Sequence, residues 1–194
     1  MTEAQKNNYR NTTDIDLFLA EIYYPILVNL AKSKDLITYK DLVDYAKKLH
    51  PQNLLVQNAI PVSTGRRLET VRKFTSKNEL PDLTSLVVNQ SKGECGEAYL
   101  KHKDPEAERS RVYNFDWSNT NIEFNLFLEI VKKEIKPRKK IKPEQARQLM
   151  SDYYQEHKLS LNTNIVDYRE IIIEMIQEGF SPEEAFKEAP LISI

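Results

Sequence analysis

The chain has 194 residues, of which 40% are hydrophobic and 29% charged, and its formal net charge is −1. Such a chain is not a polycation, so any affinity for nucleic acid must come from local clusters of Lys and Arg. Four glycines are few for a phosphate-cradling enzyme, and the lone cysteine, Cys95, excludes an intramolecular disulfide and a multi-cysteine zinc site. We find no apolar run of membrane-spanning length and no signal peptide, and we expect a cytoplasmic protein without membrane contact.

The N-terminal part predicts a flexible arm followed by a helix. Residues 1–13 are polar and form the expected arm, and Asp14 or Asp16 is expected to cap the helix that follows. Pro25 lies inside the apolar pattern of this helix and either kinks it or begins a second helix. The apolar positions share one face and are Leu19, Ile22, Tyr23, Ile26 and Leu30.

Two further helices are expected before the middle of the chain. Thr38 and Asp41 have the spacing of a capping box, and the helix that they begin ends before Pro51. Ser63 or Thr64 caps a basic helix that runs to about Lys77.

Strands are expected directly after the basic helix. Residues 83–88 predict a strand, 89–96 a turn and 97–100 a return strand, while 102–111 form a charged loop and 112–117 a third strand. A basic helix followed by such a hairpin is the order of a winged helix, whose helix enters a DNA groove.

The remainder of the chain is expected to be helical. A helix follows residues 118–121, and residues 132–142 are a linker because two prolines interrupt the pattern. Residues 144–157, 166–177 and those after Ser181 predict three more helices, and residues 167–188 hold seven acids against two bases. The expected fold class is therefore α+β and mostly helical. Its parts are the arm 1–13, a winged-helix-like domain 14–117 with an antiparallel β-hairpin or three-stranded sheet, a helix and basic linker 118–142, and an acidic helical extension 143–194.

The basic helix has two distinct faces on a helical projection. At about 100° per residue, Arg66, Thr70, Lys73 and Lys77 fall within an arc of roughly 60°, and the apolar residues occupy another arc. We interpret the first face as a cationic stripe for DNA, although a solvated face of an ordinary amphipathic helix has the same pattern. The predicted nucleic-acid-binding residues, including two lysines of the wing, are Arg66, Arg67, Thr70, Arg72, Lys73, Lys77, Lys92 and Lys101.

A second basic cluster lies in the predicted linker. It either contacts the nucleic-acid backbone, is a solvated linker, or pairs with the acidic C-terminal helices of the same or another copy. Its members are Lys132, Lys133, Lys136, Arg138, Lys139, Lys140 and Lys142.

The sequence contains few residues in a pattern typical of a catalytic site. Cys95 lies in a turn between two glutamates, which would raise the pKa of the thiol and make it a poor nucleophile. Pro81-Asp82 precedes a strand as in some metal-dependent nucleases, but the acid and lysine that should alternate on that strand are missing. We expect no catalytic residues, no metal and no cofactor.

Part of the chain is similar to the DNA-binding half of alkylguanine-DNA alkyltransferases and their inactive relatives. Ile37-Thr38-Tyr39 and Leu42 match the element that caps a helix of that winged helix, while Lys40 replaces its glycine. The Pro-Cys-His-Arg active-site motif is absent, so the resemblance implies a winged helix on DNA and not alkyl transfer. The pattern from Leu80 to the glycine-containing turn also resembles small domains found near restriction and phage-defence genes.

The leading hypothesis is a non-enzymatic DNA-binding protein that contacts the duplex backbone through its basic helix and wing. The alternative is a protein-interaction or inhibitor module of phage or defence systems that acts, or self-associates, through its acidic C-terminal helices.

Overall fold

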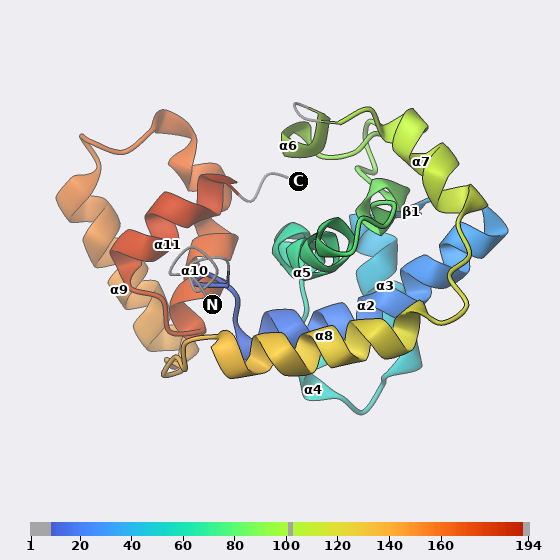
Figure 1. Cartoon of the computed structure of the whole chain (residues 1–194). Coiled ribbons are helices and arrows are strands. Elements are labelled where there is room, and N and C mark those ends of the chain that lie inside the picture. The colour runs from blue at the N-terminus through green and yellow to red at the C-terminus, as the bar shows by residue number, and fades with distance from the viewer. Residues whose placement is uncertain (1–8, 101–102, 192–194) are drawn as a thin grey trace. The chain divides into compact units, whose positions relative to one another are not determined.

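The computed structural model describes residues 9–100 and 103–191, and most of them are helical (Figure 1). The chain forms two compact units: unit 1 ends at Lys136 and unit 2 begins at Pro137. The helix after Trp117, expected outside the N-terminal domain, belongs to unit 1 because its phenylalanines lie in that unit's core. No helix of the described ranges is long and apolar enough to cross a membrane.

Unit 1 is built around one long helix, α2 (Asp14–Ser33), which packs against every other helix of that unit with ten or more residues. The elements that follow it in unit 1 are β1 (Ile37–Thr38), α3 (Tyr39–Leu49), α4 (Leu54–Gln57), η1 (Pro61–Ser63), α5 (Thr64–Lys77), η2 (Leu83–Leu86), β2 (Val87–Val88), α6 (Glu97–Leu100), α7 (Pro105–Asn114) and α8 (Thr120–Glu134).

The start of α2 is fixed by a capping box. Its N-cap is Thr13, so neither of the predicted caps, Asp14 or Asp16, holds that position. The Asp16 carboxylate accepts hydrogen bonds from the Thr13 N–H at 2.8 Å and from its hydroxyl at 2.9 Å. Pro25 neither ends the helix nor starts a new one, and α2 continues through it. Tyr9 is buried, so the end of the predicted flexible arm packs against unit 1, whereas residues 1–8 lie outside the described residues.

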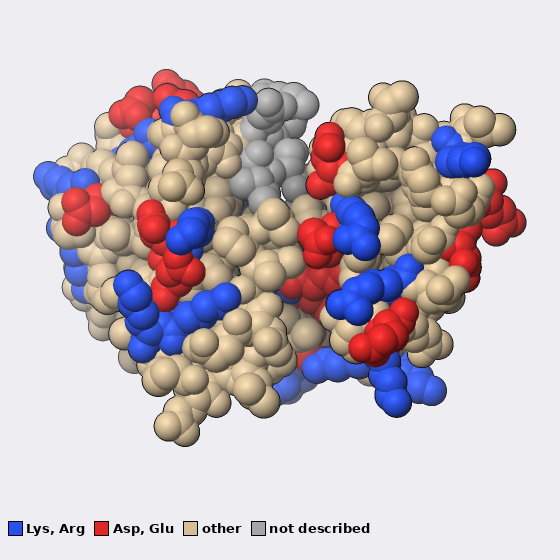
Figure 2. All heavy atoms as spheres, turned by 180° about the vertical axis from the view of Figure 1, so that it is seen from behind, with Lys and Arg blue, Asp and Glu red and all other residues tan. Residues whose placement is uncertain are grey.

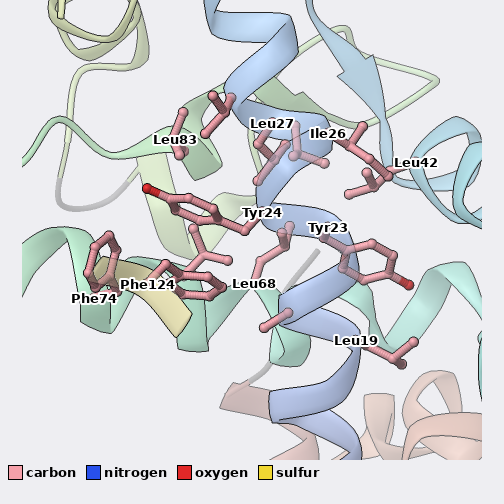
Figure 3. Close-up of a cluster of buried hydrophobic side chains, with 14 of the residues drawn as sticks. Leu19, Tyr23, Tyr24, Ile26, Leu27, Leu42, Leu68, Phe74, Leu83 and Phe124 are labelled. Atoms are coloured by element: carbon pink, nitrogen blue, oxygen red, sulfur yellow. The ribbon is translucent and has the colours of Figure 1, made fainter. Parts of the chain in front are cut away.

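An aromatic cluster joins α2, α5 and α8 (Figure 3). The rings of Tyr24 and Phe124 stack with centroids 4.0 Å apart, and the ring of Phe74 meets that of Phe124 edge-on at 5.1 Å. Aromatic pairs contribute about 0.5–1.5 kcal/mol beyond the area that they bury, so this cluster adds to the stability of unit 1. It also explains why α8 belongs to unit 1.

The predicted antiparallel hairpin is wrong. The described residues contain one sheet of two short strands, and they pair in parallel with Ile37 opposite Val87 and Thr38 opposite Val88. Residues 83–86 form the 3-10 helix η2, because the Asp82 carboxylate accepts a hydrogen bond from the Thr84 N–H at 3.0 Å and caps that turn.

The predicted return strand and third strand are also wrong. The first falls on helix α6. The first half of the second, residues 112–114, belongs to α7, which also includes most of the predicted charged loop, and residues 115–117 are irregular. Asp104 caps α7 and Pro105 occupies its first position, which is a strong start signal for a helix. A β-wing is therefore not formed by the described residues of unit 1.

Unit 2 consists of short helices around a small core of its own, which includes Ile172, Met175, Phe180 and Phe186. Its elements are α9 (Pro143–His157), η3 (Thr163–Tyr168), α10 (Arg169–Gln177), α11 (Pro182–Glu188) and η4 (Ala189–Leu191). All three predicted helices of this region are present, although the first residues of the middle one form η3.

A tight turn connects α10 to α11. Gly179 has φ +95°, and a Cβ there would lie 2.6 Å from the Lys139 carbonyl oxygen, so only glycine fits. Ser181 and Glu184 then form the capping box of α11, with Pro182 at the first helical position.

Candidate nucleic-acid interface

Helix α5 runs from Thr64 to Lys77, as the sequence predicts, but its cations are divided between the interior and the surface. Arg66 and Arg67 are 8% and 1% exposed. The Arg66 Nε lies 3.1 Å from the Asp16 carboxylate, which also accepts a hydrogen bond from Arg67 Nη1. These two arginines therefore join α5 to the start of α2.

Asp16 remains ionised in this setting. Burial by itself would raise the pKa of its carboxyl, but the attraction of Arg66 and Arg67 and their hydrogen bonds outweigh burial and lower that pKa. The carboxylate belongs to the first turn of α2, where the helix dipole also favours a negative charge. The triad is thus a structural ion cluster.

The prediction of an exposed cationic stripe is wrong for its first two residues, Arg66 and Thr70. Arg66 is paired in the interior, and Thr70, which is 3% exposed, is buried as well. A helical projection separates two faces but does not reveal how many neighbours cover them. Helix α5 packs against α2, α3, η1 and η2, so both faces of its first half are covered.

The second half of α5 brings Arg72 to a cluster of polar side chains. Its guanidinium lies 3.2 Å from the Glu69 carboxylate, 3.5 Å from that of Asp82 and 5.3 Å from the centroid of the Tyr99 ring. Asp82 also accepts a hydrogen bond from Lys103 at 2.8 Å. The charge of Arg72 is therefore largely compensated.

Two lysines complete the predicted stripe. Lys73 Nζ lies 5.4 Å from the centroid of the Tyr9 ring, and burial lowers the pKa of this lysine. Lys77 is exposed, with its Nζ 5.8 Å from the Phe127 ring centroid. Of the predicted wing lysines, Lys92 is exposed in the turn after β2, and Lys101 lies outside the described residues.

The two candidate reactive residues are both held in the interior. Cys95 is 2% exposed, its thiol donates to the Ser85 carbonyl at 3.4 Å, and burial raises its pKa despite the attraction of Arg109. The two carboxylate oxygens of Asp82 bond to Thr84 and Lys103. Within residues 9–100 and 103–191, no group of three His, Cys, Asp or Glu side chains is placed to hold a metal ion.

The second basic cluster has a different character. Pro137 and Pro143 interrupt helix formation, and residues 136–142 connect α8 to α9 without helical structure, with the Ile141 N–H donating to the Gln177 carbonyl oxygen at 2.9 Å. Only Arg138 turns inward: its Nη1 lies 3.1 Å from the Glu184 carboxylate, and its guanidinium lies 3.7 Å from the Phe180 ring centroid. The other six members are exposed, namely Lys132, Lys133, Lys136, Lys139, Lys140 and Lys142.

The charged side chains elsewhere are mixed in sign. On the face shown in Figure 2, Lys and Arg alternate with Asp and Glu, and no continuous positive field covers either unit on that face. Local clusters therefore matter more than the overall field, and the lysines of residues 132–142 form the most concentrated one.

Comparison of the chain with protein-family models, curated protein sequences and solved structures gave no match. The likeness of residues 37–100 to an alkyltransferase winged helix stays a prediction, and the function must be inferred from the side chains of this chain alone.

Proposed function

We propose that the protein is a non-enzymatic DNA-binding protein whose main contacts with the phosphate backbone are made by the lysines of residues 132–142. The observation that carries this proposal is the exposure of six lysines on one short stretch that contains a single acid, Glu134. Among the described residues, no ion pair involves any of these six lysines.

Such a stretch suits a polyanion. Duplex DNA carries one negative charge per about 1.7 Å of helix axis, and each lysine that neutralises a phosphate releases a condensed counterion. Ammonium groups on flexible stems contact phosphates without reading bases, so the binding is expected to be independent of sequence. Lys139, Lys140 and Lys142 lie within four consecutive residues of unit 2, so a single duplex segment can contact several of them.

Helix α5 has a smaller part in this proposal than its composition predicts. Arg66, Arg67 and Thr70 are buried and are left out of the contact surface, whereas Lys77 and Lys92 remain exposed as peripheral contacts.

The test is an anisotropy titration of a labelled DNA duplex at several salt concentrations. The variant Lys139→Gln/Lys140→Gln/Lys142→Gln should bind more weakly. Its negative slope of log K against log salt should become shallower by about 0.9 for each phosphate that the variant no longer neutralises. The matched control is Lys32→Gln/Lys34→Gln/Lys158→Gln, which removes three exposed lysines elsewhere and should leave the slope unchanged. Equal slopes for the two variants, or no binding by the unchanged chain at low salt, would refute the proposal.

A groove in unit 2 favours the alternative function, a protein-interaction module. This groove, of about 180 Å³, lies between α9, η3 and α10 and is lined in part by Met150, Tyr154, Val166 and Ile172. Its size suits one apolar side chain of a partner, and acidic helices surround it. If this function holds, a partner bound by the unchanged chain should no longer bind Val166→Asp but should still bind Leu126→Asp, a matched exposed position in unit 1.

A further inference from the structure

We propose that unit 1 carries a self-association surface on α3, α4 and η1, where a second copy of the chain docks by antiparallel pairing of the two α3 helices. The centre of this surface, the α3–α4 patch, consists of five large apolar side chains that remain exposed. They are Tyr45 at 47%, Leu49 at 52%, Leu54 at 76%, Leu55 at 41% and Val62 at 40% exposure.

The patch lacks charge in a chain that is otherwise rich in it. Residues 49–65 contain no Lys, Arg, Asp or Glu, whereas 29% of the whole chain is charged. Depletion of charged residues, together with exposed aromatic and aliphatic side chains, distinguishes the centre of a protein interface from the rest of a surface. A stretch that faced only solvent would not need to lack charged residues while its leucines are exposed. An exposed apolar surface of this kind marks an interaction site.

The patch is also held in place. Asn53 caps α4 by accepting hydrogen bonds from the Leu55 and Val56 N–H groups at 3.0 and 3.3 Å. Gln57 donates to the Lys47 and His50 carbonyl oxygens at 3.0 and 3.1 Å, which ties α4 to the end of α3. A surface that is ordered before contact loses little conformational entropy when a partner docks.

The charges that border the patch point to a second copy as the occupant. Asp41 and Asp44 lie in the first half of α3, and Lys47 and Lys48 lie in its last turn. Asp41, Tyr45 and Lys48 fall within about 60° of one another on the helix, so they share one exposed face. When two α3 helices pair in opposite directions close to Tyr45, Asp41 of each copy faces Lys48 of the other, while Asp44 beside the axis is paired with Lys40 of its own chain.

A second exposed apolar stripe lies on α8 among charged residues. Ile122, Leu126 and Ile130 are 67%, 62% and 48% exposed, and Glu123, Glu129 and Lys133 lie within three positions of them. The α8 stripe therefore lacks the charge-free sequence of residues 49–65, and Leu126 supplies a control position for the α3–α4 patch.

Sedimentation equilibrium over a range of protein concentrations tests the proposal. The full chain should show a concentration-dependent monomer–dimer equilibrium, and Leu54→Lys should raise the dimer dissociation constant about tenfold or more. Leu126→Lys makes the same change at a similarly exposed leucine on α8 and should leave the constant unchanged. A chain that remains monomeric throughout, or equal effects of the two variants, would overturn the proposal.

Charge reversal and crosslinking test the antiparallel pairing itself. Lys48→Glu should weaken the dimer, and adding Asp41→Lys to it should restore the dimer because the opposite charges then face each other again. Mild oxidation of Tyr45→Cys should link two chains covalently, since the native Cys95 is buried, whereas Leu126→Cys should remain unlinked. Failure of the double variant to recover, or equal crosslinking at both positions, would rule out pairing through α3.

Discussion

Asp16 and Arg67, which lie 51 residues apart in the sequence, form an ion pair inside unit 1, with each side chain only 1% exposed. Arg66 approaches the same carboxylate oxygen from the preceding position of α5. The arrangement explains why two arginines of the most basic helix face the interior, since both serve one carboxylate at the start of α2. A buried charge is costly without its partner, so this contact fixes the placement of α5 against α2.

The variant Asp16→Asn should destabilise unit 1 strongly. It keeps the shape of the side chain but removes the negative charge that both buried guanidinium groups contact, and breaking a buried pair costs about 3–5 kcal/mol. Urea unfolding followed by the fluorescence of Trp117, the single tryptophan and a core residue of unit 1, measures the loss. Asp14→Asn is the control, because Asp14 is exposed in the same first turn and should cost no more than about 1 kcal/mol. Similar losses for both variants would contradict a structural role for the cluster.

The contribution of Asp16 should depend on pH in a defined direction. Its pKa is lower in the folded protein than the value of about 3.9 in an unfolded chain. The stability that it supplies is therefore complete above that unfolded value and is lost as the pH falls through the lower folded pKa. The free energies of unfolding of the wild type and Asp16→Asn should differ most near neutral pH and converge in strong acid. A difference that stays constant across this range would show that ionisation of Asp16 is not the cause.

Gly179→Ala should disrupt unit 2, whereas Gly93→Ala should be mild. Both glycines have positive φ, +95° and +65°, which costs an alanine about 1–2 kcal/mol. Only at Gly179 would the new Cβ also meet backbone, with the Lys139 oxygen 2.6 Å away, whereas nothing lies within 4 Å at Gly93. Hydrogen exchange in α10 and α11 should quicken markedly for the first variant only. Unchanged exchange in Gly179→Ala would mean that this turn is not closely packed.

Cys95 should resist alkylation in the folded protein. Its thiol is buried and bonded to the Ser85 carbonyl, and its raised pKa leaves little of the reactive thiolate at neutral pH. Iodoacetamide should modify it at an ordinary rate only after unfolding in urea, while a thiol introduced by Ser91→Cys at an exposed position should react in the native protein. Fast native alkylation of Cys95 would indicate that this region opens readily.

Local sequence signals determined most of the helices. Thr38 begins α3 and Ser181 begins α11 as predicted, because a capping side chain and the first-turn amides that it bonds are neighbours in the chain. The basic helix also has its predicted bounds, and the hydrophobic spacing of the C-terminal helices places each of them. The mostly helical α+β class was likewise predictable, although the sheet is smaller than expected and parallel.

Only the tertiary structure decided which side chains of those helices meet solvent. The helical spacing that places Arg66 and Leu68 on different faces of α5 contains no information about Asp16. This residue is distant in sequence, and its carboxylate forms the ion pairs that keep Arg66 and Arg67 in the interior. The short segments from Leu83 to Asn114 were misassigned because strand propensity is weak over a few residues, while the caps at Asp82 and Asp104 favour helical turns. Helix formation depends on near neighbours and is readable from sequence, whereas burial and pairing depend on contacts between distant residues and are not.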